Sequence, residues 1–222
     1  MFADRAEAGR LLAERLERFK AGKPIVYALP RGGVTVALEV AKTLDAPLDL
    51  LLVRKLGAPR QPELGVGAVA EGPEPFVYLD RALCLETGAD DDFIERSKRR
   101  ELDEIERRRK LYLGDRLRPD PRGRTAIVVD DGLATGGTAR AAIGALRKAG
   151  ASQIVLAVPV APPDTAAAMR EVADEVVCLD EPAMFWGVGA FYYDFHQVSD
   201  EEVLRLLKAA PGSEGTRPAP GR

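Results

Sequence analysis

The chain has 222 residues, 46% of them hydrophobic and 30% charged, which is enough apolar material for one full domain core with a smaller appendage. Its 32 Lys and Arg residues against 35 Asp and Glu give a net charge of −3, which excludes a nucleic-acid binder held by a general excess of basic charge. No apolar run approaches the about 20 residues that a membrane-spanning helix needs, and residues 1–20 lack the apolar core and cleavage site of a signal peptide. We therefore expect no nucleic-acid partner and no membrane association.

The cysteine content points to a reducing compartment. The two cysteines, Cys84 and Cys178, lie far apart in the sequence and do not form a Cys-x-x-Cys pair. This spacing disfavours both a disulfide scaffold and a structural zinc site. Because structural disulfides are typical of oxidising compartments, we expect a cytoplasmic protein.

Strand and helix patterns alternate along most of the chain. Asp4 followed by Glu7 predicts a capped helix start, and Gly22 and Pro24 end that helix. Strands that alternate with helices indicate an α/β fold with a parallel sheet flanked by helices. The further predicted elements are strands over residues 25–29, 48–53, 125–129, 154–158 and 176–179, and helices over residues 34–44, 138–149 and 164–173.

Two regions interrupt this alternation. Residues 54–79 are rich in Gly and Pro and contain two short apolar stretches, at 66–70 and 76–79, which indicates a long excursion or a hairpin. Residues 90–112 predict a charged helix with a thin apolar stripe. Such a helix is either a solvated surface helix, which we favour, or part of a movable cover over a site.

The composition places the domain boundary near the end of the chain. Residues 210–222 consist largely of Pro, Gly and charged residues, which predicts a disordered tail. We assign residues 1–209 to a single domain.

The most informative segment, residues 127–138, reads Ile-Val-Val-Asp-Asp-Gly-Leu-Ala-Thr-Gly-Gly-Thr. A buried strand there delivers two adjacent carboxylates, Asp130 and Asp131, to its carboxyl end, and a turn of small residues then opens a helix. Such a turn can direct successive backbone N–H groups and the positive end of the helix dipole at one anion. It is not a Walker loop, because no Gly-Lys-Ser/Thr follows. Carboxylates beside a phosphate cradle fit a ligand that brings hydroxyls or a hydrated Mg²⁺.

This segment resembles the 5-phosphoribosyl-1-diphosphate (PRPP) motif of the type I phosphoribosyltransferases, in which four apolar residues, two acidic residues and a few small ones precede Thr-Gly-x-Thr. The resemblance implies that Asp130 and Asp131 hold the ribose 2′- and 3′-hydroxyls and, through water, Mg²⁺. Ala134 stands where hypoxanthine–guanine enzymes usually carry an aspartate, so a general base near the acceptor must come from elsewhere. The residues implied to wrap the 5′-phosphate are Ala134, Thr135, Gly136, Gly137 and Thr138.

A second Gly-rich turn, Pro30-Arg31-Gly32-Gly33, lies between the first strand and the next helix. Alone it indicates a simple turn. Beside the aspartate motif it resembles the diphosphate-binding loop of the family, which implies that Arg31 makes a charge-assisted contact and that Gly32 and Gly33 present backbone N–H groups. The resemblance also implies a cis peptide bond between Pro30 and Arg31.

Arg54 and Lys55 follow the second strand and are either an ordinary basic pair at a strand end or, by resemblance to the family, contacts to PRPP and its leaving diphosphate. On the second interpretation, residues 57–72 are a flexible loop that closes over the substrate, within a catalytic excursion over residues 54–114 that ends in the charged helix. Glu63 and Glu71 are candidate acidic groups in this loop.

Residues 185–195 are unusually aromatic for a chain with only 6% Phe, Trp and Tyr. Clustered aromatic residues most often belong to a core. Here residues 180–198 loosely resemble the hood of purine phosphoribosyltransferases, which implies that Phe185 stacks on the base with Trp186 next to it. His196 precedes a predicted helix cap at Ser199, so we expect a structural role for it rather than general-base work.

Together these features predict an enzyme that transfers the 5-phosphoribosyl group from PRPP to a nitrogenous base, a purine being favoured, with Mg²⁺ as cofactor and diphosphate as product. The predicted catalytic residues are Arg31, Lys55, Asp130 and Asp131. Analogy with the family adds nucleotide salvage and a homodimer. The alternatives are a non-catalytic sensor of PRPP or nucleotides and a sugar-phosphate-binding module for a partner enzyme.

Overall fold

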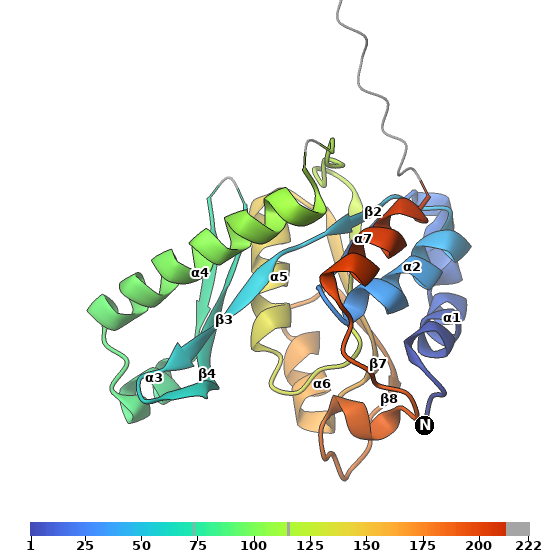
Figure 1. Cartoon of the computed structure of the whole chain (residues 1–222). Helices are drawn as coiled ribbons and strands as arrows, with labels where there is room; N and C mark the ends of the chain where they lie inside the picture. Colours follow the sequence, from blue (N-terminus) through green and yellow to red (C-terminus); the bar gives the residue numbers. More distant parts are fainter. Residues whose placement is uncertain (73, 115, 212–222) are drawn as a thin grey trace, which may run out of the picture.

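A five-stranded sheet forms the centre of the structure, a computed structural model that describes residues 1–72, 74–114 and 116–211 (Figure 1). Its strand order is β2-β1-β6-β7-β8, and every neighbouring pair is parallel. The predicted parallel α/β fold is therefore confirmed. The strands are β1 (Ile25–Ala28), β2 (Leu48–Leu50), β6 (Thr125–Val129), β7 (Gln153–Val160) and β8 (Glu175–Asp180).

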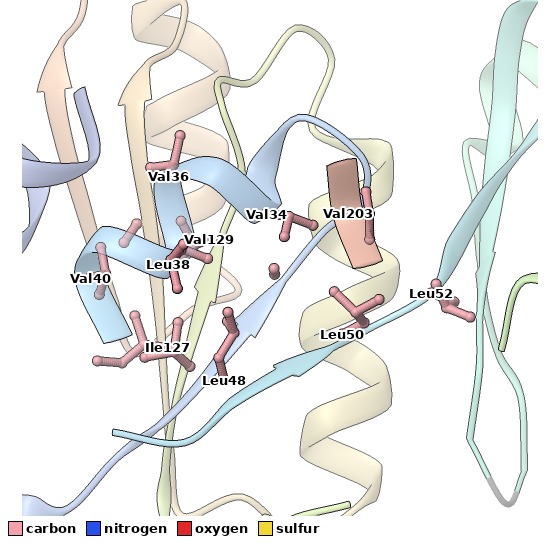
Figure 2. Close-up of a cluster of buried hydrophobic side chains, with 14 of the residues drawn as sticks. Val34, Val36, Leu38, Val40, Leu48, Leu50, Leu52, Ile127, Val129 and Val203 are labelled. Atoms are coloured by element: carbon pink, nitrogen blue, oxygen red, sulfur yellow. The ribbon is translucent and has the colours of Figure 1, made fainter. Parts of the chain in front are cut away.

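Helices cover both faces of this sheet because its central strands are apolar on both sides. On one face, Leu38 of α2 lies near Ile127 and Val129 of β6, and Val203 of α7 belongs to the same buried cluster (Figure 2). On the other face, α5 and α6 pack through Ile143 and Met169. The first group of helices is α1 (Arg5–Leu16), α2 (Gly33–Leu44) and α7 (Asp200–Lys208), and the second is α5 (Gly137–Lys148) and α6 (Pro163–Arg170). Two 3₁₀ turns, η1 (Glu17–Gly22) and η2 (Val188–Phe191), join the main elements.

The long excursion folds into a second sheet rather than a loop. Its antiparallel order is β3-β4-β5, with β3 (Val53–Ala58), β4 (Gln61–Ala70) and β5 (Phe76–Leu79). The two apolar stretches of the predicted hairpin, at 66–70 and 76–79, pair as the end of β4 and as β5, and β3 adds a third strand. Phe76 and Tyr78 pack with small residues of α5, which fixes this sheet against the main domain.

The apolar run over residues 48–53 is not a single strand, and in this respect the sequence-based prediction was wrong. β2 ends at Leu50 in the main sheet, whereas β3 begins at Val53 in the second sheet. Between them Leu52 accepts a hydrogen bond from the backbone N–H of Glu71 at 2.9 Å and donates its own N–H to the Glu71 carboxylate at 3.0 Å. Pairing with Glu71 therefore draws the chain out of the first sheet and into the second.

The charged helix forms as predicted and runs across the second sheet (Figure 1). It is α4 (Asp91–Tyr112), and the short helix α3 (Arg81–Thr87) precedes it. Ile94, Ile105 and Tyr112 are buried beneath it. The helix therefore has one packed stripe and a solvated outer face. At the other end of the domain, Ala210 is buried although the predicted tail begins there, and residues 212–222 of that tail lie outside the described residues.

Arginine side chains hydrogen-bond to backbone carbonyl oxygens of the edge strand β2. Arg116 donates to the carbonyl oxygen of Leu48 at 3.0 Å, and Arg118 donates to that of Leu50 at 2.7 Å. Arg118 also pairs with the buried carboxylates of Asp49 at 2.8 Å and Glu71 at 3.1 Å. This charge cluster joins the edge of the first sheet to the end of β4.

Removal of the Arg118 charge should destabilise the fold. In Arg118→Met the two carboxylates stay buried without their cation. We expect a loss of about 3 kcal/mol in the free energy of unfolding at neutral pH, the low end of the range for broken buried pairs, because 31% of the Arg118 side chain is exposed. Urea denaturation measures this loss.

The loss should also depend on pH. Burial already raises the pKa of Glu71, and removal of Arg118 raises it further in the folded state only. The folded state then holds a proton that the unfolded state releases, so stability falls as the pH rises. The deficit of Arg118→Met should therefore be smaller near pH ~5 than near pH ~8. Arg122→Met, which breaks an exposed pair with Asp120, is the control, and equal losses for both variants would contradict the role of the buried cluster.

Candidate functional site

Two loops that are distant in sequence meet at one edge of the main sheet. β1 and β6 pair in parallel, with Ala28 opposite Val129, so the chain leaves both strands at the same edge. A Cβ added to Gly32 would lie 1.9 Å from Oδ2 of Asp131, and one added to Gly33 would lie 2.8 Å from the carbonyl oxygen of Val129. Only glycine allows this approach. The peptide bond between Pro30 and Arg31 is cis, as the resemblance implied.

The loop after β6 forms one wall of a cavity of about 410 Å³. Gly136 has a left-handed backbone with φ of 76°, and α5 starts at the next residue. The first N–H groups of α5 and the positive end of its dipole therefore lie at this wall, where an anion is stabilised. The predicted phosphate residues that line the cavity are Ala134, Thr135, Gly136, Gly137 and Thr138.

The two adjacent aspartates differ in environment. Asp130 lines the same cavity, and its carboxylate accepts the backbone N–H of Asp131 at 2.9 Å. Burial, together with the neighbouring negative charge of Asp131, raises the pKa of Asp130 well above the usual range. Asp131 instead pairs with Arg5, whose Nε lies 2.7 Å from Oδ2. The two neighbouring carboxyl groups therefore have different electrostatic surroundings.

Arg5 was not a predicted site residue, and no sequence signal marks it as one. Asp4 next to it caps α1 by accepting the N–H of Glu7 at 2.8 Å, as predicted, which gives the segment a sufficient local explanation. The partner of Arg5 lies 126 positions away in the chain. Only the packing of α1 beside the PRPP motif reveals the contact.

The two neighbouring basic residues of β3, Arg54 and Lys55, face different surroundings. Lys55 lines the cavity opposite the phosphate loop and donates to the carbonyl oxygen of Glu63 at 2.6 Å. Arg54 pairs with Glu101 of α4 at 2.9 Å and is not among the residues that line the cavity. Successive strand residues point to opposite faces, so only one of two neighbours can face the cavity. The structure thus brings Lys55, not Arg54, next to the phosphate loop.

Arg31 is not among the residues that line that cavity. It lies 3.4 Å from the carboxylate of Asp200, which also accepts the hydroxyl of Tyr112 at 2.5 Å. The hydrogen bond from Tyr112 and the charge of Arg31 together lower the pKa of Asp200. In this arrangement Arg31 ties its loop to the first turn of α7.

The aromatic segment lies against the PRPP motif without lining the cavity. The Tyr192 hydroxyl donates to the carbonyl oxygen of Asp131 at 2.6 Å, and a Cβ on Gly132 would lie 2.6 Å from the Val188 side chain. Phe185 stacks on Phe191 with ring centroids 5.5 Å apart, and Trp186 is 83% exposed. Neither of the two predicted base-binding residues, Phe185 and Trp186, is among the residues that line the cavity.

Of the remaining acidic and histidine candidates, one lines the cavity and two lie elsewhere. Glu63 lines the cavity, whereas Glu71 lies in the buried cluster with Arg118. His196 lies 3.1 Å from Asp194 and 3.4 Å from Glu202, near the cap that Ser199 provides for α7. These contacts fit the structural role expected for His196.

In the described residues, no group of three or more His, Cys, Asp or Glu side chains is arranged to hold a metal ion. Mg²⁺ commonly keeps several waters and binds through one or two carboxylates together with substrate phosphates. Asp130 and Asp131 beside a phosphate loop fit that kind of site. In the same part of the chain, no helix has both the length and the apolarity required to cross a bilayer.

The close approach of the two loops can be tested by stability. Gly32→Ala places a methyl group on the Asp131 carboxylate, so we expect a loss of about 2 kcal/mol in unfolding free energy from overpacking. Gly22→Ala is the matched control, because a Cβ there meets nothing within 4 Å and the entropy change of the unfolded chain is shared. Thermal and urea unfolding measure both variants. A Gly32→Ala protein as stable as Gly22→Ala would show that the loops can separate freely.

Comparison with known proteins identifies the family. A family model for the phosphoribosyl transferase domain matches residues 3–196. Two proteins from strains CDC 1551 and H37Rv of Mycobacterium tuberculosis, each named "Putative phosphoribosyl transferase", are 47% identical over 210 residues. That match covers 95% of this chain and 47% of each relative, so the chain spans about half the length of these proteins.

Further similarities support the same assignment. A stretch of 61 residues is 49% identical to the uracil phosphoribosyltransferase of Lactobacillus gasseri, covering 28% of this chain and 29% of that protein. The crystal structure of TT1426 from Thermus thermophilus aligns with a TM-score of 0.81 at 42% identity, over 96% of this chain and 100% of that one. With the family model covering most of its length, the chain belongs to the type I phosphoribosyltransferase family.

Proposed function

We propose that the protein transfers the 5-phosphoribosyl group from PRPP to a nitrogenous base and releases diphosphate. The observation that carries this proposal is the shared cavity, in which the N-terminus of α5, the carboxylate of Asp130 and the ammonium group of Lys55 face the same space. A phosphate, a set of sugar hydroxyls and a departing diphosphate are one chemical match for that combination.

The 5-phosphoribosyl part of the substrate is proposed to bind at the loop after β6. The loop from Ala134 to Thr138 would accept the 5′-phosphate on its backbone N–H groups and on the hydroxyls of Thr135 and Thr138. Asp130 and Asp131 would accept hydrogen bonds from the ribose 2′- and 3′-hydroxyls. Binding at both ends fixes C1 of the ribose relative to the second loop.

The diphosphate would lie toward the loop after β1. Gly32 and Gly33 would present backbone N–H groups, and Lys55 would approach from β3. Arg31 and Arg54 stay proposed PRPP contacts, although both are now paired with carboxylates and would have to exchange those partners for phosphate oxygens. Bound Mg²⁺, held by substrate oxygens and through water by Asp130 and Asp131, would neutralise part of the charge on the leaving group.

The reaction itself asks mainly for electrostatic stabilisation. The bond from C1 to the diphosphate oxygen breaks with its electron pair on that oxygen, a nitrogen of the base bonds to C1, and its proton is released. The carbon passes through an oxocarbenium-like state, so cations near the leaving oxygen and carboxylates near the ribose both lower its energy. Because Ala134 cannot accept the proton that the base releases, another protein group or water must accept it.

A planar base, with a purine favoured, is the proposed acceptor. The support comes from residues 185–195, where exposed aromatic rings lie on a segment that Tyr192 anchors to Asp131. Phe185 and Trp186 remain the proposed stacking residues. Cytoplasmic nucleotide salvage by a homodimer completes the proposal by analogy with the family.

The experiment is a measurement of diphosphate released from PRPP and Mg²⁺ with purine and pyrimidine bases added singly. Release that requires one base establishes the reaction and names the acceptor. Tight binding of PRPP without release for any base would instead favour the sensor.

Lys55 provides the sharpest single-residue test of the transfer step. Lys55→Ala removes a cation that faces the cavity, so we expect kcat to fall about 100-fold while binding of a 5′-nucleotide stays within about twofold. Lys110→Ala, on the exposed face of α4, is the control and should leave kcat unchanged. Equal loss of nucleotide affinity and kcat would place Lys55 in ground-state binding rather than in departure of the diphosphate.

A further inference from the structure

Arg5 is a buried cation at the start of α1, with only 7% of its surface exposed. Its guanidinium makes three separate contacts. Nε donates to Oδ2 of Asp131 at 2.7 Å, Nη1 donates to the carbonyl oxygen of His196 at 2.8 Å, and Cζ lies over the Phe195 ring, 3.8 Å from its centre. A buried charge is costly unless its partners are well placed, so each of these contacts constrains the others.

Asp131 is held on two sides by this region. Arg5 donates a hydrogen bond to one oxygen of its carboxylate, and the Tyr192 hydroxyl donates to its backbone carbonyl oxygen at 2.6 Å. Because a carboxylate offers about four lone-pair sites, Asp131 can still accept hydrogen bonds from a ligand while Arg5 occupies one of them. The two contacts fix where the remaining sites point.

The N-terminal residues are themselves fastened to the aromatic segment. The N–H of Phe2 donates to the carbonyl oxygen of Phe191 at 2.8 Å, and the N–H of Tyr193 donates back to Phe2 at 2.9 Å. The N–H of Asp194 donates to Ala3 at 2.9 Å. Since Arg5 follows directly, the start of α1 and residues 191–196 form one unit beside the PRPP motif.

We propose that Arg5 is a positioning residue for the sugar: it orients the Asp131 carboxylate toward the ribose hydroxyls and joins that carboxylate to the segment over residues 191–196. This inference rests on the proposed function, because it assigns Asp131 to a ribose phosphate. Arg5 lies outside both loops of the proposed site. On this inference, α1 contributes to recognition of the sugar.

The side-chain geometry requires arginine at this position. A guanidinium presents donors in a planar fork, so it donates to Asp131 and His196 in two directions while its Cζ lies over the Phe195 ring. A lysine ammonium can keep the charge next to Asp131 but cannot stack in the same way. Lysine should therefore preserve part of the function, and glutamine should preserve little.

The test uses binding rather than turnover. Calorimetry on the full chain compares ribose 5-phosphate, its 2-deoxy and 3-deoxy analogues, and inorganic phosphate. The unaltered protein should bind ribose 5-phosphate more tightly than at least one deoxy analogue. In Arg5→Gln this preference should shrink by about tenfold, the effect of one lost charge-assisted contact, whereas affinity for inorganic phosphate should change less than twofold. Arg5→Lys should fall between the two.

Two controls separate the possible failures. Arg10→Gln, on the exposed side of the same helix, should leave every affinity unchanged. If Arg5→Gln does not fold, Arg5→Lys carries the test, and its full retention of the sugar preference would overturn the inference. A folded Arg5→Gln protein that keeps the preference would likewise overturn it while leaving the proposed function intact. No preference in the unaltered protein would overturn the proposed function and this inference together.

Discussion

The parallel pairing of β1 with β6 is the constraint on which the rest of the site depends. With Ala28 opposite Val129, the turn after one strand and the aspartates after the other leave the sheet together. The glycines at 32 and 33 then allow backbone to touch backbone and carboxylate. An antiparallel pairing would have sent the two loops to opposite edges, and a bulkier turn would have held them apart. One strand register therefore decides whether a single ligand can reach both loops.

Two adjacent carboxylates repel an anionic ligand, so a site that places them beside an anion-binding loop needs nearby positive charge. Here the α5 N-terminus provides positive potential, Lys55 adds a cation from the second sheet, and Arg5 of α1 pairs with Asp131. Burial of Asp130 and the neighbouring charge of Asp131 raise the pKa of Asp130. Each cation comes from a different element, so the electrostatic balance is a property of the assembled domain.

Much of this organisation was readable from the sequence, because the signals are local. The PRPP motif, the turn over residues 30–33 and the helix caps at Asp4 and Ser199 each consist of neighbouring residues whose geometry follows from their types. The departures are tertiary. Leu52 pairs with Glu71 where the chain passes from the first sheet to the second, and strand alternation turns Arg54 toward α4. The contact of Arg5 with the site could not be predicted from the sequence, because its partner Asp131 lies 126 residues away in the chain.

The most direct measurement of the central claim is a competition experiment on PRPP binding in the presence of Mg²⁺. If the loops after β1 and β6 form one site, PRPP should bind with one-to-one stoichiometry. Ribose 5-phosphate alone and diphosphate alone should each displace it completely, because each matches one part of PRPP and would occupy one part of the same site. Displacement by ribose 5-phosphate together with independent, simultaneous binding of diphosphate and PRPP would contradict the account, since the two loops would then serve separate ligands.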